Sequence, residues 1–116
     1  MVTVIKVTFD ITTSTEVITG VTGKKHYIVA FSVFNNDTSS REICELATLN
    51  PTTYLYGGDN QGIFLKKNGG NFTLPIQVYP HSNKLIPWFE TNTGSGFWIT
   101  PVSSKRLSGE IIYYTE

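Results

Sequence analysis

The chain is organised around the stretch NGGNFTLPIQVYPHSNKLIPWFET, residues 68–91. It begins with Asn-Gly-Gly, whose residues tolerate a positive φ and therefore predict a sharp turn. Phe72, Leu74 and Ile76 follow at a spacing of two, which places their side chains on one side of an extended strand. This stretch therefore predicts a turn followed by a β-strand.

Prolines and an aromatic pair mark the second half of this stretch. Pro75 and Pro80 have no backbone N–H to give to a sheet, so the strand is predicted to lie at a sheet edge or to be interrupted, with a proline-bearing loop after it. Trp88 and Phe89 follow a third proline and form the densest aromatic block in the chain. Rings of this size predict a core plug or a contact between subunits.

Residues 26–35 give the strongest strand pattern. Strict alternation places Tyr27, Val29, Phe31 and Val33 on one face, and the opposite face is also largely apolar. Only one face of a small antiparallel sheet can point at the subunit's own core. The second apolar face would be a patch that monomers rarely carry, so it predicts an oligomer.

The other predicted strands are short and are separated by turns rich in Gly, Pro and Asn. Residues 41–48 fit a helical stripe or an alternating strand, and a strand is favoured because every neighbouring segment is a strand. The remaining strands are expected at residues 2–12, 16–19, 53–56, 62–66, 97–101 and 107–115.

This strand pattern predicts the fold class. The total is about eight strands, which is typical of an all-β antiparallel β-sandwich, with a jelly roll as a common arrangement. Residues 1–116 are expected to form a single domain, with residues 1–12 as an N-terminal arm or edge strand.

Composition narrows the class of partner. Nine basic and nine acidic residues cancel, so we expect no binding to nucleic acid or to an anionic membrane. Cys44 is the single cysteine, which excludes an internal disulfide and favours folding in a reducing compartment. The first residues alternate like a strand and do not resemble a signal peptide, so synthesis in the cytoplasm of the producing cell is expected.

The residue types of enzymes and metal sites are present but not in the required patterns. His26 and His81 lie in no cluster of ligands, so no metal is expected. The turn around Asp59 supplies one carboxylate, too few for a calcium loop. Glu42 and Glu45 lie near one polar loop, and nothing marks them as a glycosidase pair. Without a catalytic signature the chain is predicted to be neither an enzyme nor the carrier of a cofactor.

Aromatic side chains offer one alternative, because their faces stack on sugar rings. Packing in the core and at interfaces is the favoured explanation for them. The rings considered for a sugar-binding platform are Tyr54, Tyr56, Tyr79, Trp88, Phe97 and Trp98.

Several short motifs occur in an order that resembles that of a known protein family. Gly-Lys-Lys at residues 23–25 leads directly into the strand at 26–34, and LKKNGGNFTLP follows at residues 65–75. Trp-Phe-Glu-Thr lies at 88–91, and LSGEIIY lies at 107–113 in the last predicted strand. Over residues 20–115 this order resembles the small jelly-roll proteins that decorate, or cement, the heads of tailed bacteriophages.

The resemblance implies a structural virion protein: a homotrimer on the outer capsid surface that clamps neighbouring major capsid proteins. Its trimer contacts would include Phe31, Trp88, Phe89 and Tyr113. The N-terminal strand would contact the capsid by β-addition, through Val2, Val4, Lys6 and Phe9.

Two other functions stay open at this point. A glycan-binding module of a phage fibre or spike is the alternative, since jelly rolls host both roles. A hydrolase fragment is a weaker third hypothesis, because it would need a cleft with a perturbed pair of acids.

Overall fold

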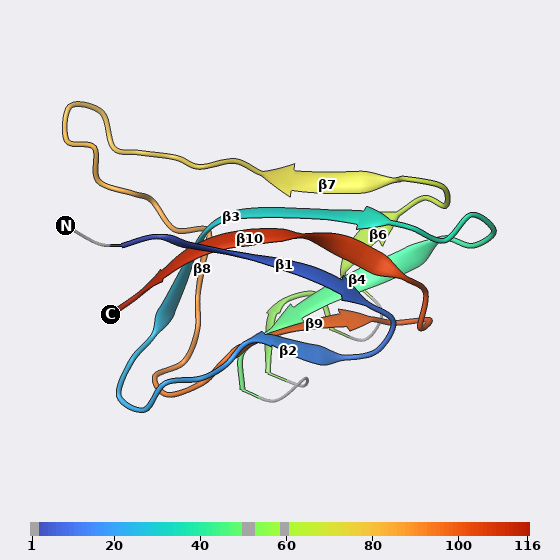
Figure 1. The fold of residues 1–116 in the computed structure, drawn as a ribbon, viewed down its shortest axis with the longest axis horizontal. Helices are drawn as coiled ribbons and strands as arrows, with labels where there is room; N and C mark the ends of the chain where they lie inside the picture. Colours follow the sequence, from blue (N-terminus) through green and yellow to red (C-terminus); the bar gives the residue numbers. More distant parts are fainter. Residues whose placement is uncertain (1–2, 50–52, 59–60) are drawn as a thin grey trace.

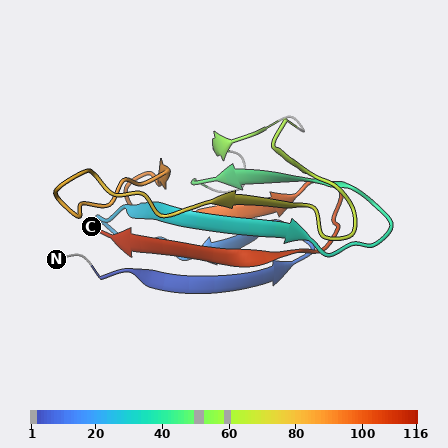
Figure 2. The ribbon, with the colours of Figure 1, turned by 90° about the horizontal axis from the view of Figure 1, so that it is seen from above.

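The computed structural model describes residues 3–49, 53–58 and 61–116. Every regular element in these ranges is a β-strand, as the sequence predicted. In the part of the chain so described there is no helix long and apolar enough to cross a membrane. The strands form two antiparallel sheets that pack face to face as a β-sandwich (Figures 1 and 2).

The first sheet, sheet A, contains both the first and the last strand of the chain. β3 lies inside it and pairs with β10, β7 and β8. Its order is β1 (Ile5–Ile11), β10 (Leu107–Thr115), β3 (His26–Asn35) and β7 (Asn71–Leu74), and β8 (Phe89–Glu90) pairs with the start of β3. In the described residues β1 pairs with β10 alone, which leaves its other edge open.

The second sheet, sheet B, is built around β4. Its order is β2 (Thr15–Ile18), β9 (Phe97–Pro101), β4 (Glu42–Ala47) and β5 (Tyr54–Tyr56), and β6 (Ile63–Leu65) pairs with β4. The segment that fitted either a helix or a strand is thus the strand β4. Its neighbours supply the backbone partners that a short strand needs.

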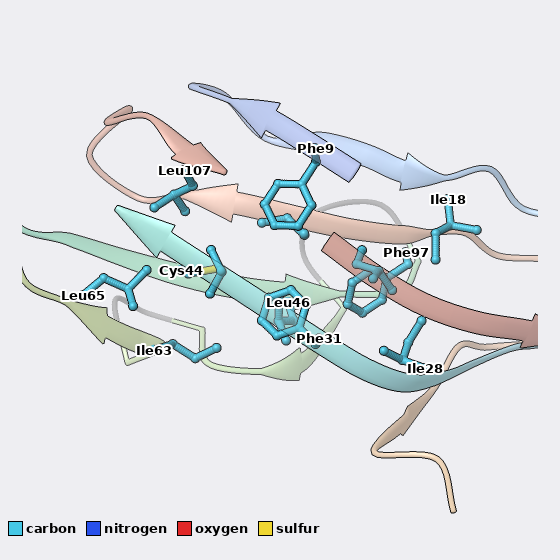
Figure 3. Packing of buried hydrophobic residues seen from close by; sticks show 13 residues of the cluster. Phe9, Ile18, Ile28, Phe31, Cys44, Leu46, Ile63, Leu65, Phe97 and Leu107 are labelled. Atoms are coloured by element: carbon cyan, nitrogen blue, oxygen red, sulfur yellow. The ribbon is translucent and has the colours of Figure 1, made fainter. Parts of the chain in front are cut away.

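The core lies between the two sheets (Figure 3). Phe9 from β1 stacks with Phe31 from β3, with ring centroids 6.3 Å apart. Leu46 and Phe97 reach the same core from sheet B and are fully buried. Each large side chain buried in this way contributes about 1.5–3 kcal/mol. The other core members are Ile18, Ile28, Val33, Cys44, Ile63, Leu65, Ile99, Leu107 and Ile111.

A β-bulge in β3 interrupts the alternation of inward- and outward-facing side chains that the sequence predicted. Ala30 lies opposite Ile112 and Ile28 lies opposite Tyr113, so Val29 is an extra residue on β3. An extra residue shifts the period of a strand by one position. Ile28 therefore joins the core, whereas strict alternation placed it on the opposite face.

The outer side of sheet A is also less apolar than expected. One row of paired residues on this side runs across β1, β10, β3 and β7, next to the row that contains Phe31. Its residues are Thr8, Glu110, Ser32 and Thr73. Near the C-terminal end of β10, Tyr27 stacks on Tyr114 with ring centroids 4.9 Å apart. The sheet thus has a polar row on the side that the alternation of β3 predicted to be apolar.

The stretch at residues 68–91 turns and ends its strand as predicted. Asn68 and Gly69 have φ values of 61° and 94°. The Gly69 N–H donates to the carbonyl oxygen of Asn35 at 2.8 Å, which fixes the turn against the end of β3. β7 lies at the edge of sheet A and ends directly before Pro75.

Candidate functional site

Two of the residues that the resemblance assigned to contacts with other chains lie in the subunit's own core. Phe31 is 1% exposed and Phe9 is 8% exposed, and both belong to the buried cluster between the sheets. Neither side chain has enough surface to offer to another molecule. Phe31 is therefore removed from the candidate trimer contacts, and Phe9 is removed from the candidate capsid contacts.

The other three predicted trimer residues are partly buried by contacts within the subunit. Phe89 and Tyr113 pack against the core cluster, and the Tyr113 ring meets the His26 ring edge-on at a centroid distance of 5.5 Å. Trp88 donates its indole N–H to the carbonyl oxygen of Pro75 at 2.8 Å. These contacts position other parts of the same chain.

The predicted N-terminal contact falls partly on exposed residues. Val4 is 48% exposed and precedes β1, whose outer edge is open, whereas Val2 lies outside the described residues. Lys6 is exposed on β1 and forms an ion pair with Glu110 at 3.0 Å. A lysine on an edge strand discourages unspecific pairing with other chains.

The segment between β7 and β8 is a hairpin, where the sequence predicted only a loop. We call residues 75–88 the hairpin; it extends to the end of the molecule where both termini lie (Figure 1). Val78 and Leu85 form a β-bridge across it. The Tyr79 N–H donates to the Lys84 carbonyl at 2.8 Å, and residues 77 and 86 are joined by a backbone hydrogen bond of 2.9 Å. The segment is therefore held together across its width.

The hairpin exposes apolar side chains. Ile76, Val78 and Tyr79 are 50%, 49% and 49% exposed. Ile76 was expected to share the face of Phe72 and Leu74, but the chain leaves the sheet at Pro75, so Ile76 is solvent-facing. Three such side chains on one short hairpin are typical of a contact surface.

Beside the hairpin, the outer side of sheet A is hollowed. One hollow of about 270 Å³ is lined by Ala30, Ile112, Glu110 and Ile76, among others. A second hollow, of about 550 Å³, lies between the hairpin and the ends of the chain. Its lining includes Ile76, Lys84, Leu85, Val4, Tyr114 and Glu116. We call the two hollows together the trough, because Ile76 lines both.

A polar network lies on sheet A, near the C-terminal end of β1. The Arg106 guanidinium donates two hydrogen bonds to the Asp10 carboxylate, at 2.7 and 2.6 Å, and the Ser108 hydroxyl donates a third at 2.9 Å. The hydrogen bonds from Arg106 and then Ser108 lower the pKa of Asp10 from 3.8 to about 2. The network joins β1 to the start of β10, and its carboxylate is already satisfied by these donors.

Of the two histidines and the single cysteine, His26 and Cys44 are buried and His81 is exposed. His26 is buried, with its ring nitrogens 2.8 Å from the Thr115 hydroxyl and the Thr19 carbonyl oxygen, and His81 lies exposed in the hairpin. Burial, reinforced by two nearby glutamates of β4, raises the pKa of the Cys44 thiol far above its ordinary value. Within the described ranges no three His, Cys, Asp or Glu residues gather as metal ligands. Asp59 lies outside those ranges.

The six aromatic rings considered for a sugar platform are spread over the molecule. Phe97 is buried in the core, Tyr79 lies on the hairpin, and Trp88 lies at its base. The other three lie in sheet B, on the two strands that flank β4, and are Tyr54, Tyr56 and Trp98. The rings do not form one stacking surface.

The hairpin has a partial signal in the sequence. Residues 77–79 and 84–86 are short runs that flank Pro-His-Ser-Asn, a composition typical of a hairpin loop. The sequence alone does not specify that Val78 pairs with Leu85.

Comparison with known proteins adds no relative to this picture. The chain was compared with models of protein families, with curated proteins and with solved structures, and no match was found in any of the three.

Proposed function

We propose that this chain is a structural virion protein, a homotrimeric decoration or cement protein. It would bind the major capsid protein on the outer surface of a tailed-phage head. The observation that carries the proposal is the hairpin, which presents half-exposed Ile76, Val78 and Tyr79 on a sheet whose β1 edge is open. Both features serve binding to protein surfaces, by apolar contact and by β-addition.

We also propose that the sandwich is a jelly roll. Successive strands alternate between the sheets at the start of the chain, with β1 and β3 in sheet A and β2 and β4 in sheet B. The last strand returns to lie between the first and the third, and β9 lies between β2 and β4. This order supports two Greek keys, which is the arrangement of a jelly roll.

A protein of this kind stabilises a shell by mass action. It would bind the assembled, expanded head and not the free capsid subunits, so its binding energy would favour the assembled state. At a free concentration of about 100 times the dissociation constant, each site would contribute about 2.7 kcal/mol. A trimer on a three-fold position would make each contact three times, so weak single contacts would sum.

The test is binding to expanded empty heads assembled from the major capsid protein of the same genome. We expect saturable co-sedimentation and a rise in the melting temperature of the heads. The same preparation is applied to a glycan array. Glycan binding without head binding would contradict the proposal and support the fibre or spike alternative.

A further inference from the structure

We propose that Asn68 is a site of spontaneous deamidation and that the folded turn around it controls the rate of the reaction. This inference goes beyond the proposed function and does not depend on it. Asn68 lies in residues 66–70, which we call the crossover turn because they lead from β6 in sheet B to β7 in sheet A. The turn lies at the end of the sandwich away from the chain termini (Figure 1).

The pair Asn68 and Gly69 has the composition that favours this reaction. Deamidation begins when the backbone nitrogen of the following residue attacks the side-chain carbonyl carbon of asparagine. Glycine has no side chain to shield that nitrogen, and Asn68 is the one asparagine of the chain that precedes a glycine. Both residues are exposed, so water reaches them. Sequence and exposure therefore distinguish Asn68 from the other asparagines.

The reaction needs water and no other reactant. The Gly69 nitrogen loses its proton and bonds to Cγ of Asn68, and the side-chain nitrogen leaves as ammonia, which gives a succinimide ring. Water then adds to one of the two carbonyl carbons of the ring, and the bond from that carbon to the Gly69 nitrogen breaks. Opening at Cγ gives aspartate. Opening at the backbone carbonyl carbon gives isoaspartate, in which the chain continues through Cγ.

In the folded chain the attacking nitrogen is engaged elsewhere. The Gly69 N–H donates to the Asn35 carbonyl oxygen at 2.8 Å, and the Asn68 N–H donates to the Asp37 carbonyl oxygen at 2.7 Å. The Asn35 N–H donates in turn to the Gly70 carbonyl oxygen at 2.9 Å. The bond from Gly69 must break before its nitrogen can lose the proton and reach Cγ. The turn therefore reacts from a locally open state, and the population of that state sets the rate.

The acceptors of these bonds lie at the end of β3 and just after it, in a segment that side chains hold in place. The buried Asn35 side chain accepts the Asp37 N–H at 2.8 Å and donates to the Ser40 carbonyl oxygen at 2.9 Å. The Asp37 carboxylate accepts N–H bonds from Ser39 at 2.8 Å and Ser40 at 2.7 Å. Weakening this segment should open the crossover turn without changing either reacting residue.

The backbone conformation explains why a reactive pair occupies this turn. Asn68 and Gly69 have φ values of 61° and 94°, which lie in the left-handed region. Glycine adopts this region without steric cost, and asparagine does so more readily than most residues with a side chain. The turn between the two sheets thus favours the two residue types that deamidate fastest when they are adjacent.

Isoaspartate at position 68 would weaken the attachment of β7. It adds one carbon atom to the backbone path directly before Gly69, so the Gly69 N–H would no longer match the Asn35 carbonyl oxygen. The pairing of β7 with β3 begins two residues later, where Asn71 lies opposite Phe34. The modified turn should therefore loosen the start of β7, the strand from which the hairpin continues.

The test follows Asn68 by peptide mapping with mass spectrometry during incubation at mildly alkaline pH. Deamidation is read from the gain in mass, and isoaspartate from its methylation by an isoaspartyl methyltransferase. Asn68 should deamidate at least roughly tenfold more slowly in the folded chain than in guanidinium chloride. Asn83 is the internal control, because it is also exposed with a positive φ, 54°, but is followed by lysine. In guanidinium chloride it should react more slowly than Asn68.

Two variants test the control by the neighbouring segment. Asp37→Ala removes the acceptor of the bonds from Ser39 and Ser40. It should speed the deamidation of Asn68 several-fold in the folded chain and leave the rate in guanidinium chloride unchanged. Thr38→Ala, at the exposed next position, is the matched control and should leave both rates unchanged. Circular dichroism should show the same β-sheet spectrum for both variants and the native chain.

The consequence for β7 is measured by amide exchange. The isoaspartate form should exchange the amides of β7 faster than the unmodified chain, while the amides of β10 keep their protection. Asn68→Asp is the control for this experiment, because it carries the same new charge without the added backbone carbon. Its β7 amides should exchange as slowly as those of the native chain.

Each part of the inference has a result that overturns it. Faster reaction of Asn83 than of Asn68 in guanidinium chloride would refute the choice of site. Equal rates for Asn68 in the folded and unfolded chain, or no effect of Asp37→Ala, would refute the control by the turn. Unchanged β7 exchange in the isoaspartate form would refute the structural consequence. None of these measurements involves phage heads, so a failure of the proposed function would leave this inference standing, and the reverse also holds.

Discussion

Trp88 and Pro75 close the base of the hairpin through one hydrogen bond, in which the indole N–H donates to the Pro75 carbonyl oxygen at 2.8 Å. Proline ends β7 because it has no N–H for the sheet, but its carbonyl oxygen remains available as an acceptor. The chain thus leaves the sheet at Pro75 and returns to it at Phe89, with the two ends of the hairpin tied together.

Trp88→Phe should loosen the hairpin without unfolding the sandwich. The substitution keeps an aromatic ring and removes the donor, at a cost of about 1 kcal/mol for one net hydrogen bond. Amide exchange of Tyr79 and Ile86 should become roughly fivefold faster, while amides of β3 keep their protection. Trp98→Phe, in the other sheet, is the matched control. Unchanged exchange at Tyr79 and Ile86 would show that the indole bond does not hold the hairpin.

Asp10 should make the protein's stability depend on pH in the acidic range. Its pKa is about 2 in the folded protein and 3.8 ordinarily, so the unfolded chain binds more protons between these values. The stabilisation is fully present above the ordinary pKa and is lost as the pH falls through the folded-state pKa. The melting temperature of the native chain should therefore fall more steeply in this window than that of Asp10→Asn.

Comparing the native chain with the Asp10→Asn variant separates the contribution of Asp10 to the pH dependence of stability from that of the other carboxyl groups. The pKa of Asp37 is also lowered, by hydrogen bonds from Ser39 and Ser40, and it acts in the same direction in both proteins. Plotted against pH, the two melting temperatures should converge at the acid end of the window and separate toward neutral pH, with the native chain the more stable. Parallel plots across the whole range would contradict the role of the Arg106 and Ser108 contacts.

The positions of the strands could be predicted from the sequence because their signals are local. The alternation in residues 26–35, 97–101 and 107–115 corresponds to β3, β9 and β10 with the same bounds. Gly and Asn between the runs marked turns, as Asn68 and Gly69 show through their positive φ values. Such signals need only neighbouring residues.

The faces of the strands were predicted less well, because they depend on pairing. The bulge at Val29 is visible only once β10 lies beside β3, and it places Ile28 in the core while Tyr27 stays partly exposed. β3 was expected to have two apolar faces on the assumption of unbroken alternation, which fails at the bulge. The hairpin was missed for the same reason, since the bridge between Val78 and Leu85 is a contact and not a local pattern.

Gly109→Ala should destabilise the centre of sheet A. Gly109 lies on β10 between Phe9 of β1 and Val33 of β3. An added Cβ would collide with the Ser32 carbonyl oxygen and would lie 2.9 Å from Cζ of Phe9. Overpacking of this kind costs about 1–3 kcal/mol. Urea unfolding measures the loss, with the exposed Thr8→Ala as a control that should stay within about 0.5 kcal/mol of the native chain. Equal stability of the two variants would mean that the sheet opens to accept the methyl group.

Two glutamates of β4 are both buried but differ in their partners. The Glu42 carboxylate accepts N–H bonds from Ile43 at 2.7 Å, Lys105 at 2.8 Å, and Ser103 at 2.9 and 3.1 Å. It thereby fixes the connection between β9 and β10. Glu45 is 6% exposed, and its Oε2 has no hydrogen-bond partner among the described residues.

Glu42→Gln should therefore cost more stability than Glu45→Gln, although the chemical change is the same. Glutamine offers one acceptor oxygen in place of two, and at position 42 its amide N–H₂ would face backbone donors that then lose their acceptor. The loss at Glu42 should be about 1–3 kcal/mol, the cost of leaving buried groups unsatisfied. At Glu45 the substitution breaks no bond to Oε2, so urea unfolding should show a smaller loss or a gain. If both variants unfold at the same urea concentration, the backbone bonds to Glu42 do not hold the connection between β9 and β10.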